Sequence, residues 1–384
     1  MDFTIPEEMR IMKDTIRRFV EQEIDPISEQ IEEEDALPEH IVEQMRELGL
    51  FGMGIPEEYG GLGLNTLAEC MVFEEISRAN TSVRTRFATN NGIGGLGILF
   101  DGTEEQKKKY LPDIASGRKT IAFALTEPDV GSDASGIKTF AQRQGDHFVI
   151  NGSKMFITNG AIADLVTLIA LTDREKRARG GVTAFIVERG TKGFSVGKHE
   201  KKMGLRGSTT TELIFEDCEV PVENVIGGEG LIGQGFKTAM KVLDKGRLTL
   251  AAGSVGTAQK ALDLAVRYAK ERVQFGRPIG QFQLIQDMLA RMATEVYAGR
   301  QMVYRVAWEK DQGRSVIMEA SMAKLFCSEM LGRVADMALQ IHGGLGYMKD
   351  FMVERIYRDA RAARIYEGTS EIQKIVIARE LLRN

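Results

Sequence analysis

Apolar residues in the first third of the chain have the spacing of amphipathic helices. They recur every three or four positions in two stripes, at Met9, Met12, Ile16 and Phe19 and then at Ile41, Met45, Leu48 and Leu50. Prolines at positions 6, 26, 38 and 56 stand near the expected helix boundaries. The pattern predicts a helical N-terminal domain over residues 1–120.

From residue 121 the pattern changes to short runs that favour strands. The expected strands are Thr120–Leu125, His147–Ile150, Met155–Thr158, Leu165–Leu171, Val182–Val187 and Glu212–Phe215. Asn151-Gly152 lies between two of these runs and indicates a tight hairpin. Because no helical pattern separates the strands, we expect an antiparallel barrel or sandwich over residues 121–232.

Long helical patterns return over residues 233–384. They cover Phe236–Phe275, Phe282–Asp311 and Met318–Gln340, with glycine-rich breaks at His342-Gly343-Gly344 and at Gly368. The whole chain is therefore predicted to be α+β, with a β domain between two helical domains.

Composition and charge narrow the classes of function. The 384 residues are 43% hydrophobic and 27% charged, with a net charge of −5, which is typical of a globular protein and does not favour nucleic-acid binding. Three widely spaced cysteines indicate reduced thiols in a cytoplasmic protein, and four isolated histidines do not predict a metal site. The start of the chain, Met1–Glu8, lacks the pattern of a signal peptide, and no apolar run is long enough to predict a membrane span.

Two glycine motifs resemble dinucleotide-binding loops but stand in the wrong context. Gly92–Gly97 and Gly228–Gly233 both fit G-x-G-x-x-G, a pattern that binds dinucleotides only between a strand and a helix of a βαβ unit. The first lies in the helical segment, and no parallel strand follows the second at the right distance. A phosphate-binding lysine motif and a G-x-S-x-G nucleophile motif are also missing from the sequence, so a nicotinamide enzyme or a hydrolase is disfavoured.

Glu367 is the candidate general base. It lies between Tyr366 and Gly368, directly before a predicted last helix that begins with Ser370 as N-cap and Gln373 in a capping box. A carboxylate on such a loop can be held at the end of an apolar cavity, where burial raises its pKa toward neutrality. The alternative is an ordinary carboxylate on a solvent-exposed loop.

A second candidate site is the turn after the first predicted strand, within Phe123–Asp133. Its Gly, Ser and Asp residues can offer backbone N–H and hydroxyl donors to a pyrophosphate or to the polar edge of a ring. The alternative is a capped β-turn with a structural role alone.

Both segments resemble motifs of the acyl-CoA dehydrogenase family. IYEGTSEIQ, residues 365–373, is similar to the catalytic-base motif, and TEPDVGSD, residues 126–133, is similar to the family's first signature. The resemblance covers nearly the whole chain in the same order. It implies a C-terminal four-helix bundle, FAD as the cofactor and Glu367 as the base that removes the α-proton of an acyl-CoA thioester. Some relatives carry the base at the position that matches Gly246. Glycine cannot act as a base, so Glu367 has no competitor there.

The resemblance also implies cofactor and substrate contacts. The FAD contacts are Phe123, Leu125, Thr126, Gly131, Ser132, Phe156, Thr158, Arg272, Phe275, Gln283, Gln340, Gly344, Thr369 and Glu371. Many relatives carry Trp in place of Phe156. In the family, the contacts around Arg272 reach FAD from a neighbouring subunit. The resemblance therefore implies a homotetramer (a dimer of dimers). The substrate contacts are Ser132, Asp244, Arg247 and Gly368, although Asp244 and Arg247 could instead form a surface ion pair at i,i+3.

Arg84 is a departure from a pocket built for a plain alkyl chain. It falls where relatives that act on glutaryl-CoA carry an arginine for the distal carboxylate, and a buried guanidinium needs such a partner. The alternative is that Arg84 reaches solvent or pairs with Glu74 or Glu75.

The sequence thus predicts an FAD-dependent acyl-CoA dehydrogenase for short to medium chains, with an electron-transferring flavoprotein as electron acceptor. The alternatives are a short dicarboxylyl-CoA dehydrogenase that uses Arg84, an acyl-CoA oxidase, or a non-catalytic CoA-binding or helical scaffold protein. No metal, nucleic acid or membrane partner is predicted.

Overall fold

Seven helices form the N-terminal part of the computed structural model, which describes residues 5–383. They are α1 Glu7–Phe19, α2 Ser28–Glu34, α3 Glu39–Glu47, α4 Thr66–Ile76, α5 Thr81–Asn91, α6 Leu96–Asp101 and α7 Glu104–Ala115. Residues 1–4 of the stretch examined for a signal peptide lie outside the described part. The two predicted stripes are confirmed as core-facing, because Ile16, Phe19, Ile41 and Met45 are buried.

Side-chain caps set where several of these helices begin. Asn65 caps α4 by accepting a hydrogen bond from Ala68 N, and Asn80 caps α5 through Ser82 N. Thr103 and Gln106 form a complete capping box at α7. Such caps satisfy backbone N–H groups that have no partner within the helix.

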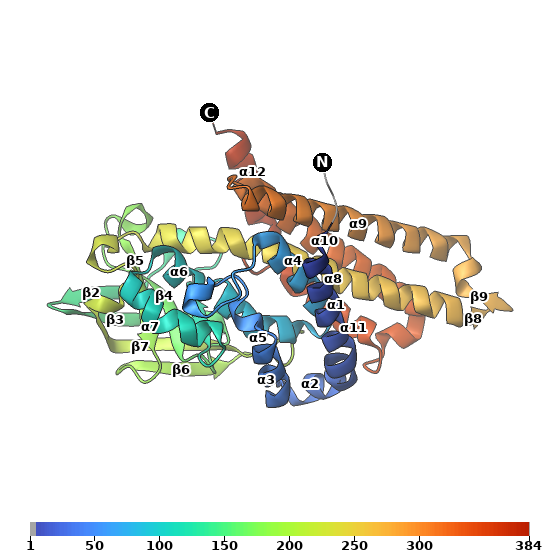
Figure 1. The fold of residues 1–384 in the computed structure, drawn as a ribbon, viewed down its shortest axis with the longest axis horizontal. Coiled ribbons are helices and arrows are strands. Elements are labelled where there is room, and N and C mark those ends of the chain that lie inside the picture. Colours follow the sequence, from blue (N-terminus) through green and yellow to red (C-terminus); the bar gives the residue numbers. More distant parts are fainter. Residues whose placement is uncertain (1–4, 384) are drawn as a thin grey trace.

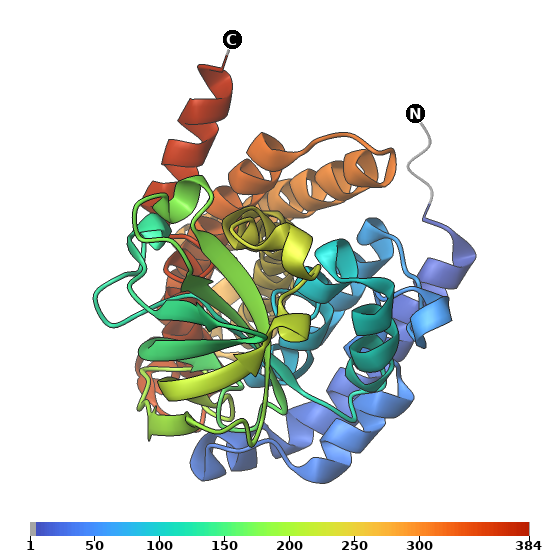
Figure 2. The ribbon, with the colours of Figure 1, turned by 90° about the vertical axis from the view of Figure 1, so that its left-hand side faces the viewer.

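The middle of the chain is one curved seven-stranded sheet (Figure 2). Its strands are β1 Ile121–Ala124, β2 Phe140–Gln144, β3 His147–Thr158, β4 Leu165–Leu171, β5 Val182–Glu188, β6 Phe194–His199 and β7 Thr210–Pro221. The order is β1-β4-β2-β3-β7-β6, with β5 on β4. Most pairs are antiparallel, as predicted, but β1 and β4 are parallel, and one parallel pair joins β2 to β4.

The predicted hairpin at Asn151-Gly152 is wrong. These residues lie inside the continuous strand β3, at an irregularity in its pairing with β7. The turn falls earlier, at Gly145-Asp146. Gly152 is required for a different reason: a Cβ there would lie 2.8 Å from the Cα of Thr139 on the neighbouring chain segment. The glycine therefore allows a close backbone approach rather than a turn.

Five helices and a small hairpin complete the fold. They are α8 Gly235–Glu271, the hairpin strands β8 Val273–Gln274 and β9 Arg277–Pro278, α9 Gln283–Asp311, α10 Ile317–His342, α11 Met352–Ala360 and α12 Ser370–Leu381. The three long helical patterns are confirmed by α8, α9 and α10. Helix α8 runs from the sheet, on one side of the molecule, to the β8–β9 hairpin at the opposite end (Figure 1). It packs on α4, α9 and α10, so it belongs to the helical core and also reaches the sheet.

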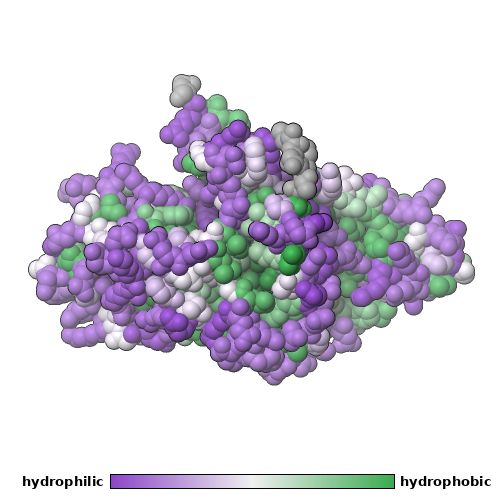
Figure 3. Space-filling model, in the orientation of Figure 1, coloured by the Kyte–Doolittle hydropathy of each residue, from purple (hydrophilic) through white to green (hydrophobic). Residues whose placement is uncertain are grey.

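The apolar core has a helical part and two parts on the sheet. The helical part joins α1, α3, α4 and α5 to α8, α9, α10 and α11. Hydrophilic side chains cover most of the face seen in Figure 3, and hydrophobic residues gather toward its middle. No helix within residues 5–383 has the length and apolar character needed to cross a membrane.

Candidate active site

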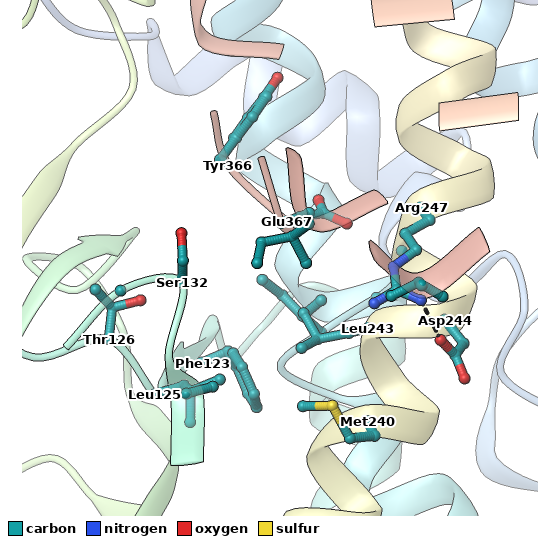
Figure 4. A pocket seen from close by; sticks show the side chains of 18 of the residues that line it. Phe123, Leu125, Thr126, Ser132, Met240, Leu243, Asp244, Arg247, Tyr366 and Glu367 are labelled. Carbon is teal, nitrogen blue, oxygen red and sulfur yellow. Dashed lines mark hydrogen bonds and ion pairs between the residues drawn. The ribbon is translucent and has the colours of Figure 1, made fainter. Parts of the chain in front are cut away.

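A cavity of about 1180 Å³ lies where the sheet meets the helices. Its walls come from α5, the turn after β1, the end of β3, α8, the loop before α12, and α12 itself. In Figure 4, Glu367 lies between residues of the β1 segment, such as Thr126 and Ser132, and α8 residues, such as Arg247. Residues far apart in sequence thus face one space.

The loop before α12 presents Glu367 with an unusual backbone. Glu367 has φ 54° and Gly368 has φ 88°, so two consecutive residues adopt the left-handed conformation. The predicted cap is corrected by one residue: the side chain of Thr369 caps α12 through Ile372 N at 3.3 Å. Ser370 is the first helical residue, and its hydroxyl donates to Glu329 at 2.6 Å. The cap therefore lies one residue nearer Glu367 than predicted, directly after Gly368 with its positive φ.

The carboxylate of Glu367 has the environment expected of a general base. Its Oε2 is buried and has no hydrogen-bond partner within the described chain. Burial raises the pKa of Glu367, and the nearby cations of Arg84, Lys324 and Arg247 oppose that rise. An unpaired carboxylate oxygen facing a cavity is available to accept a proton from a ligand.

Gly246 on α8 faces Glu367 across a very short gap. A Cβ at this position would collide with Oε2 of Glu367 and lie 3.3 Å from its Cδ and from Ile93 Cγ2. Position 246 and the predicted base Glu367 are thus neighbours in space. A side chain at position 246 would have to displace the carboxylate of Glu367.

The side of the cavity formed by the sheet matches a flavin. Phe156 lines the cavity with 59% of its surface exposed, at φ 59°, where the pairing of β3 with β7 is interrupted. Such an exposed aromatic face suits a planar ring system. Phe123, Leu125, Thr126, Gly131, Ser132 and Thr158 line the same wall. The residues present therefore fit the predicted cofactor.

A buried ion pair that the sequence analysis missed supports this wall. Lys154 Nζ lies 2.8 Å from Glu127 Oε1 and donates to the Leu125 carbonyl at 2.9 Å. Glu127 also accepts from the backbone N–H groups of Lys138 and Thr139. The pair joins β3 to the turn after β1. Glu127 lies within the motif at residues 126–133 and Lys154 directly precedes the predicted strand Met155–Thr158, but neither spacing nor periodicity indicates that they meet.

Asp244 and Arg247 lie on α8 and line the cavity. Arg247 Nη1 contacts Asp244 Oδ1 at 2.5 Å, so the predicted i,i+3 ion pair is present (Figure 4). It is not a surface pair, because Arg247 is buried and its Nε has no hydrogen-bond partner in the described chain. Burial raises the pKa of Asp244 and lowers that of Arg247. The free Nε leaves Arg247 able to bind a ligand as well.

Arg84 on α5 is 5% exposed and lines the cavity. Its Nη2 donates to the Tyr366 hydroxyl at 2.8 Å, and its Nε is buried without a partner among the described residues. The alternative pairing with Glu74 or Glu75 is wrong. Those carboxylates are engaged elsewhere, by Arg300 at 2.8 Å and by Arg17 at 2.9 Å.

The remaining predicted cofactor residues do not line this cavity. Thr369 is the N-cap of α12, and Glu371 is the second residue of that helix. The others gather toward the hairpin end of the molecule, at Arg272, Phe275, Gln283, Gln340 and Gly344. Stacking of Tyr268 on His342, with ring centroids 4.3 Å apart, holds the ends of α8 and α10 together there. Phe275, at the tip of the hairpin, is 92% exposed.

Family profiles cover nearly all of the chain. The N-terminal, middle and C-terminal domains of acyl-CoA dehydrogenase match residues 6–118, 122–218 and 233–382. The chain belongs to the acyl-CoA dehydrogenase family. The predicted family, fold class and reaction class, an oxidoreductase acting on CH–CH groups, are confirmed, and so is FAD as the cofactor of this family.

Curated relatives of this acyl-CoA dehydrogenase family member include enzymes named for either direction of the reaction. The chain is 44% identical to "Acyl-CoA dehydrogenase, short-chain specific" of Clostridium acetobutylicum, over 100% of both chains. It is 45% identical to "Acryloyl-CoA reductase (NADH)" of Anaerotignum propionicum, over 100% of this chain and 96% of the relative. It is 43% identical to "Caffeyl-CoA reductase-Etf complex subunit CarC" of Acetobacterium woodii, over 98% and 99%.

Solved structures of the family superpose closely. Butyryl-CoA dehydrogenase of Megasphaera elsdenii matches with a TM-score of 0.96 and 39% identity, over 100% of both chains. A glutaryl-CoA dehydrogenase–glutaryl-CoA complex matches with a TM-score of 0.94 and 39% identity, over 100% and 97%. An acyl-CoA dehydrogenase of Bacillus anthracis complexed with FAD matches with a TM-score of 0.92 and 39% identity, over 99% and 68%.

Proposed function

We propose that this enzyme dehydrogenates a short-chain acyl-CoA thioester to the trans-2-enoyl-CoA, with Glu367 as the base that takes the α-proton. The observation that carries the proposal is the buried, unpartnered Oε2 of Glu367 on the cavity, with a pKa raised by burial. A carboxylate held in this way accepts a proton near neutral pH more readily than an exposed one.

We assign the remaining cofactor and substrate contacts to other residues that line the cavity. FAD supplies the acceptor for the β-hydride when it is bound. Thr126, Ser132 and Phe156 lie on the wall that would hold its ring, opposite α8. The backbone N–H of Glu367 would donate to the thioester carbonyl, while Asp244 and Arg247 would contact the CoA portion. Ser132 and Gly368 complete the substrate contacts.

We further propose that the cofactor site is completed by a second copy of the chain in a homotetramer. The five residues at the hairpin end of α8, α9 and α10 do not line the cavity of their own chain, and Phe275 is exposed; they are Arg272, Phe275, Gln283, Gln340 and Gly344. An exposed aromatic beside an arginine suits adenine and pyrophosphate. The extents of the three family profiles support a division at residues 1–120, 121–232 and 233–384.

The electron partner is proposed to be an electron-transferring flavoprotein. The support comes from the relative named as a subunit of a caffeyl-CoA reductase–Etf complex. We also propose a cytoplasmic role in β-oxidation, which requires the enzyme to run toward the enoyl product. Some relatives are named as reductases, so the competing outcome is reduction of an enoyl-CoA to the acyl-CoA.

A second candidate substrate is a short dicarboxylyl-CoA. The observation that favours it is Arg84, a buried guanidinium on the cavity with a free Nε and only the neutral Tyr366 hydroxyl as a side-chain partner among the described residues. A distal carboxylate would supply the missing charge. The similarity to a structure solved with glutaryl-CoA supports the same reading.

Anaerobic bleaching of the bound flavin tests these proposals. Butyryl-CoA, octanoyl-CoA and glutaryl-CoA are compared at equal concentration. Fast reduction by butyryl-CoA alone supports the short-chain proposal, and fast reduction by glutaryl-CoA alone supports the dicarboxylyl one. Rapid peroxide formation in air would indicate an oxidase, and a colourless protein that refuses FAD would indicate a non-catalytic scaffold.

A further inference from the structure

Two buried side chains hold the backbone that carries Glu367. Lys324 on α10 donates from Nζ to the Gly368 carbonyl at 2.6 Å. Gln373 on α12 donates from Nε2 to the carbonyls of Glu367 and Gly368, at 3.2 and 3.0 Å. Lys324 and Gln373 are both 0% exposed. Two consecutive carbonyls are therefore tied to two different helices.

These contacts stabilise a strained backbone conformation. Glu367, at φ 54°, is in a conformation that residues with a Cβ rarely adopt, and it persists only where the surroundings impose it. Helix α10 also engages Ser370, the first residue of α12, since Glu329 accepts from the Ser370 hydroxyl at 2.6 Å. The position of Glu367 is thus fixed by contacts from both α10 and α12.

The two ties differ in charge. Gln373 is neutral, whereas Lys324 brings an ammonium group close to a carboxylate that is largely removed from water. Burial lowers the pKa of Lys324 to about 8, while the charge of Glu367 opposes that change. The other charged groups that face Lys324 are Arg247, Glu329 and Glu371, and those that face Glu367 are Arg84, Lys324 and Arg247.

We propose that Lys324 is a positioning residue that keeps the base both in place and ionised. Its ammonium holds the Gly368 carbonyl and favours the carboxylate form of Glu367, so that the base can accept a proton at neutral pH. Gln373 shares the first task but not the second. This inference rests on the proposed role of Glu367 as the base.

Proton removal can be measured apart from turnover with a 3-thia-acyl-CoA. Sulfur replaces its β-carbon, so it has α-protons but no β-hydride to give. Exchange of these protons into D₂O, followed by proton NMR, reports transfer to Glu367 and back. If the wild-type enzyme exchanges these protons and Glu367→Gln does not, Glu367 is the base. This comparison tests the proposed function by itself, so its failure can be told apart from failure of the inference about Lys324.

The exchange rate should fall at low pH as Glu367 becomes protonated, and the pH at which it reaches half of its maximum is the midpoint of this acid limb. Lys324→Met should raise that midpoint by on the order of one pH unit, because a nearby cation that favours the carboxylate is lost. On the acid side this is a roughly tenfold slower exchange. Lys324→Arg should keep the wild-type midpoint. Gln373→Met should slow exchange at every pH without moving the midpoint. Lys202→Met is a matched control, since this lysine also donates to a carbonyl, that of Ser208 at 2.7 Å, and is not part of the site.

An acid limb in FAD-loaded Lys324→Met that coincides with the wild-type limb would overturn the inference. So would a Gln373→Met variant that moves the midpoint as far as Lys324→Met does. If Lys324→Met does not fold, Lys324→Gln keeps a neutral donor for the Gly368 carbonyl, and it should show the same shift. A wild-type midpoint in that variant would leave Lys324 a structural role alone.

Discussion

Gly246 and Glu367 share a single space between α8 and the loop before α12. A Cβ on Gly246 would collide with Oε2 of Glu367, so the glycine is what allows the carboxylate to enter the cavity from the α12 side. The lack of a side chain at Gly246 and the position of the Glu367 carboxylate therefore depend on each other.

Gly246→Ala should therefore displace the carboxylate of Glu367 and slow reduction of the flavin by the best acyl-CoA about 100-fold, the cost of a displacement near 1 Å. Stopped-flow bleaching under anaerobic conditions measures it. Gly230→Ala is the matched control, because a Cβ there meets nothing within 4 Å and its rate should stay unchanged. A wild-type rate in Gly246→Ala would show that the loop yields to the new methyl group.

Glu367→Gln should retain bound, yellow FAD and lose bleaching by substrate about 10²–10⁴-fold, because the amide cannot accept the α-proton. The change is nearly isosteric, and Oε2 makes no hydrogen bond within the described chain, so little stability is lost. Absorbance spectra before and after substrate addition give both quantities. Retained turnover would refute the base assignment.

Arg84→Met tests the substrate class. If a dicarboxylyl-CoA is the substrate, removing the guanidinium should lower kcat/KM for glutaryl-CoA by about 100-fold or more, because its carboxylate would be buried unpaired. The effect on butyryl-CoA should stay within about threefold, since Met fills much of the same volume.

Tyr366→Phe serves as a control for Arg84→Met, because it removes the hydroxyl that binds Arg84 Nη2 but leaves the cation in place. A large loss of kcat/KM for butyryl-CoA in Arg84→Met would contradict the role of Arg84 in binding a substrate carboxylate. It would show instead that the guanidinium supports the cavity wall.

Asp359 should make stability depend on pH in an unusual direction. Burial raises the pKa of this α11 carboxyl to about 6, against an ordinary value of 3.8. The folded state thus favours the protonated acid, and the stabilisation is fully present below pH 3.8 and lost as pH rises through about 6. The change amounts to about 3 kcal/mol.

Asp359→Asn should remove that pH dependence while keeping an Oδ1 acceptor for Leu205 N, which lies 2.6 Å away. Urea unfolding of both proteins from pH 4 to 7.5 measures it. The stability of the wild type relative to the variant should fall as pH rises. Parallel curves across this range would contradict the raised pKa.

The sequence by itself determined the features that depend on local pattern. The 3.6-residue periodicity of α8, α9 and α10 follows from the need to bury one face of each helix, and it is readable without knowing what covers that face. The family motifs likewise identify Glu367 and the wall that includes Thr126, Ser132 and Phe156, because each lies within a short continuous segment.

Only the tertiary structure decided the features that depend on which segments meet. The local sequence Asn151-Gly152 predicts a hairpin turn. In the structure these residues lie within β3, where Thr139 packs closely against Gly152. The contact of Arg84 with Tyr366 joins residues 282 positions apart, and that of Lys324 with Gly368 joins residues 44 apart. Neither pair has a periodic signal, because such contacts arise from the packing of α5 and α10 against the loop before α12. That packing, rather than any single motif, gives the carboxylate of Glu367 its depth and its charged surroundings.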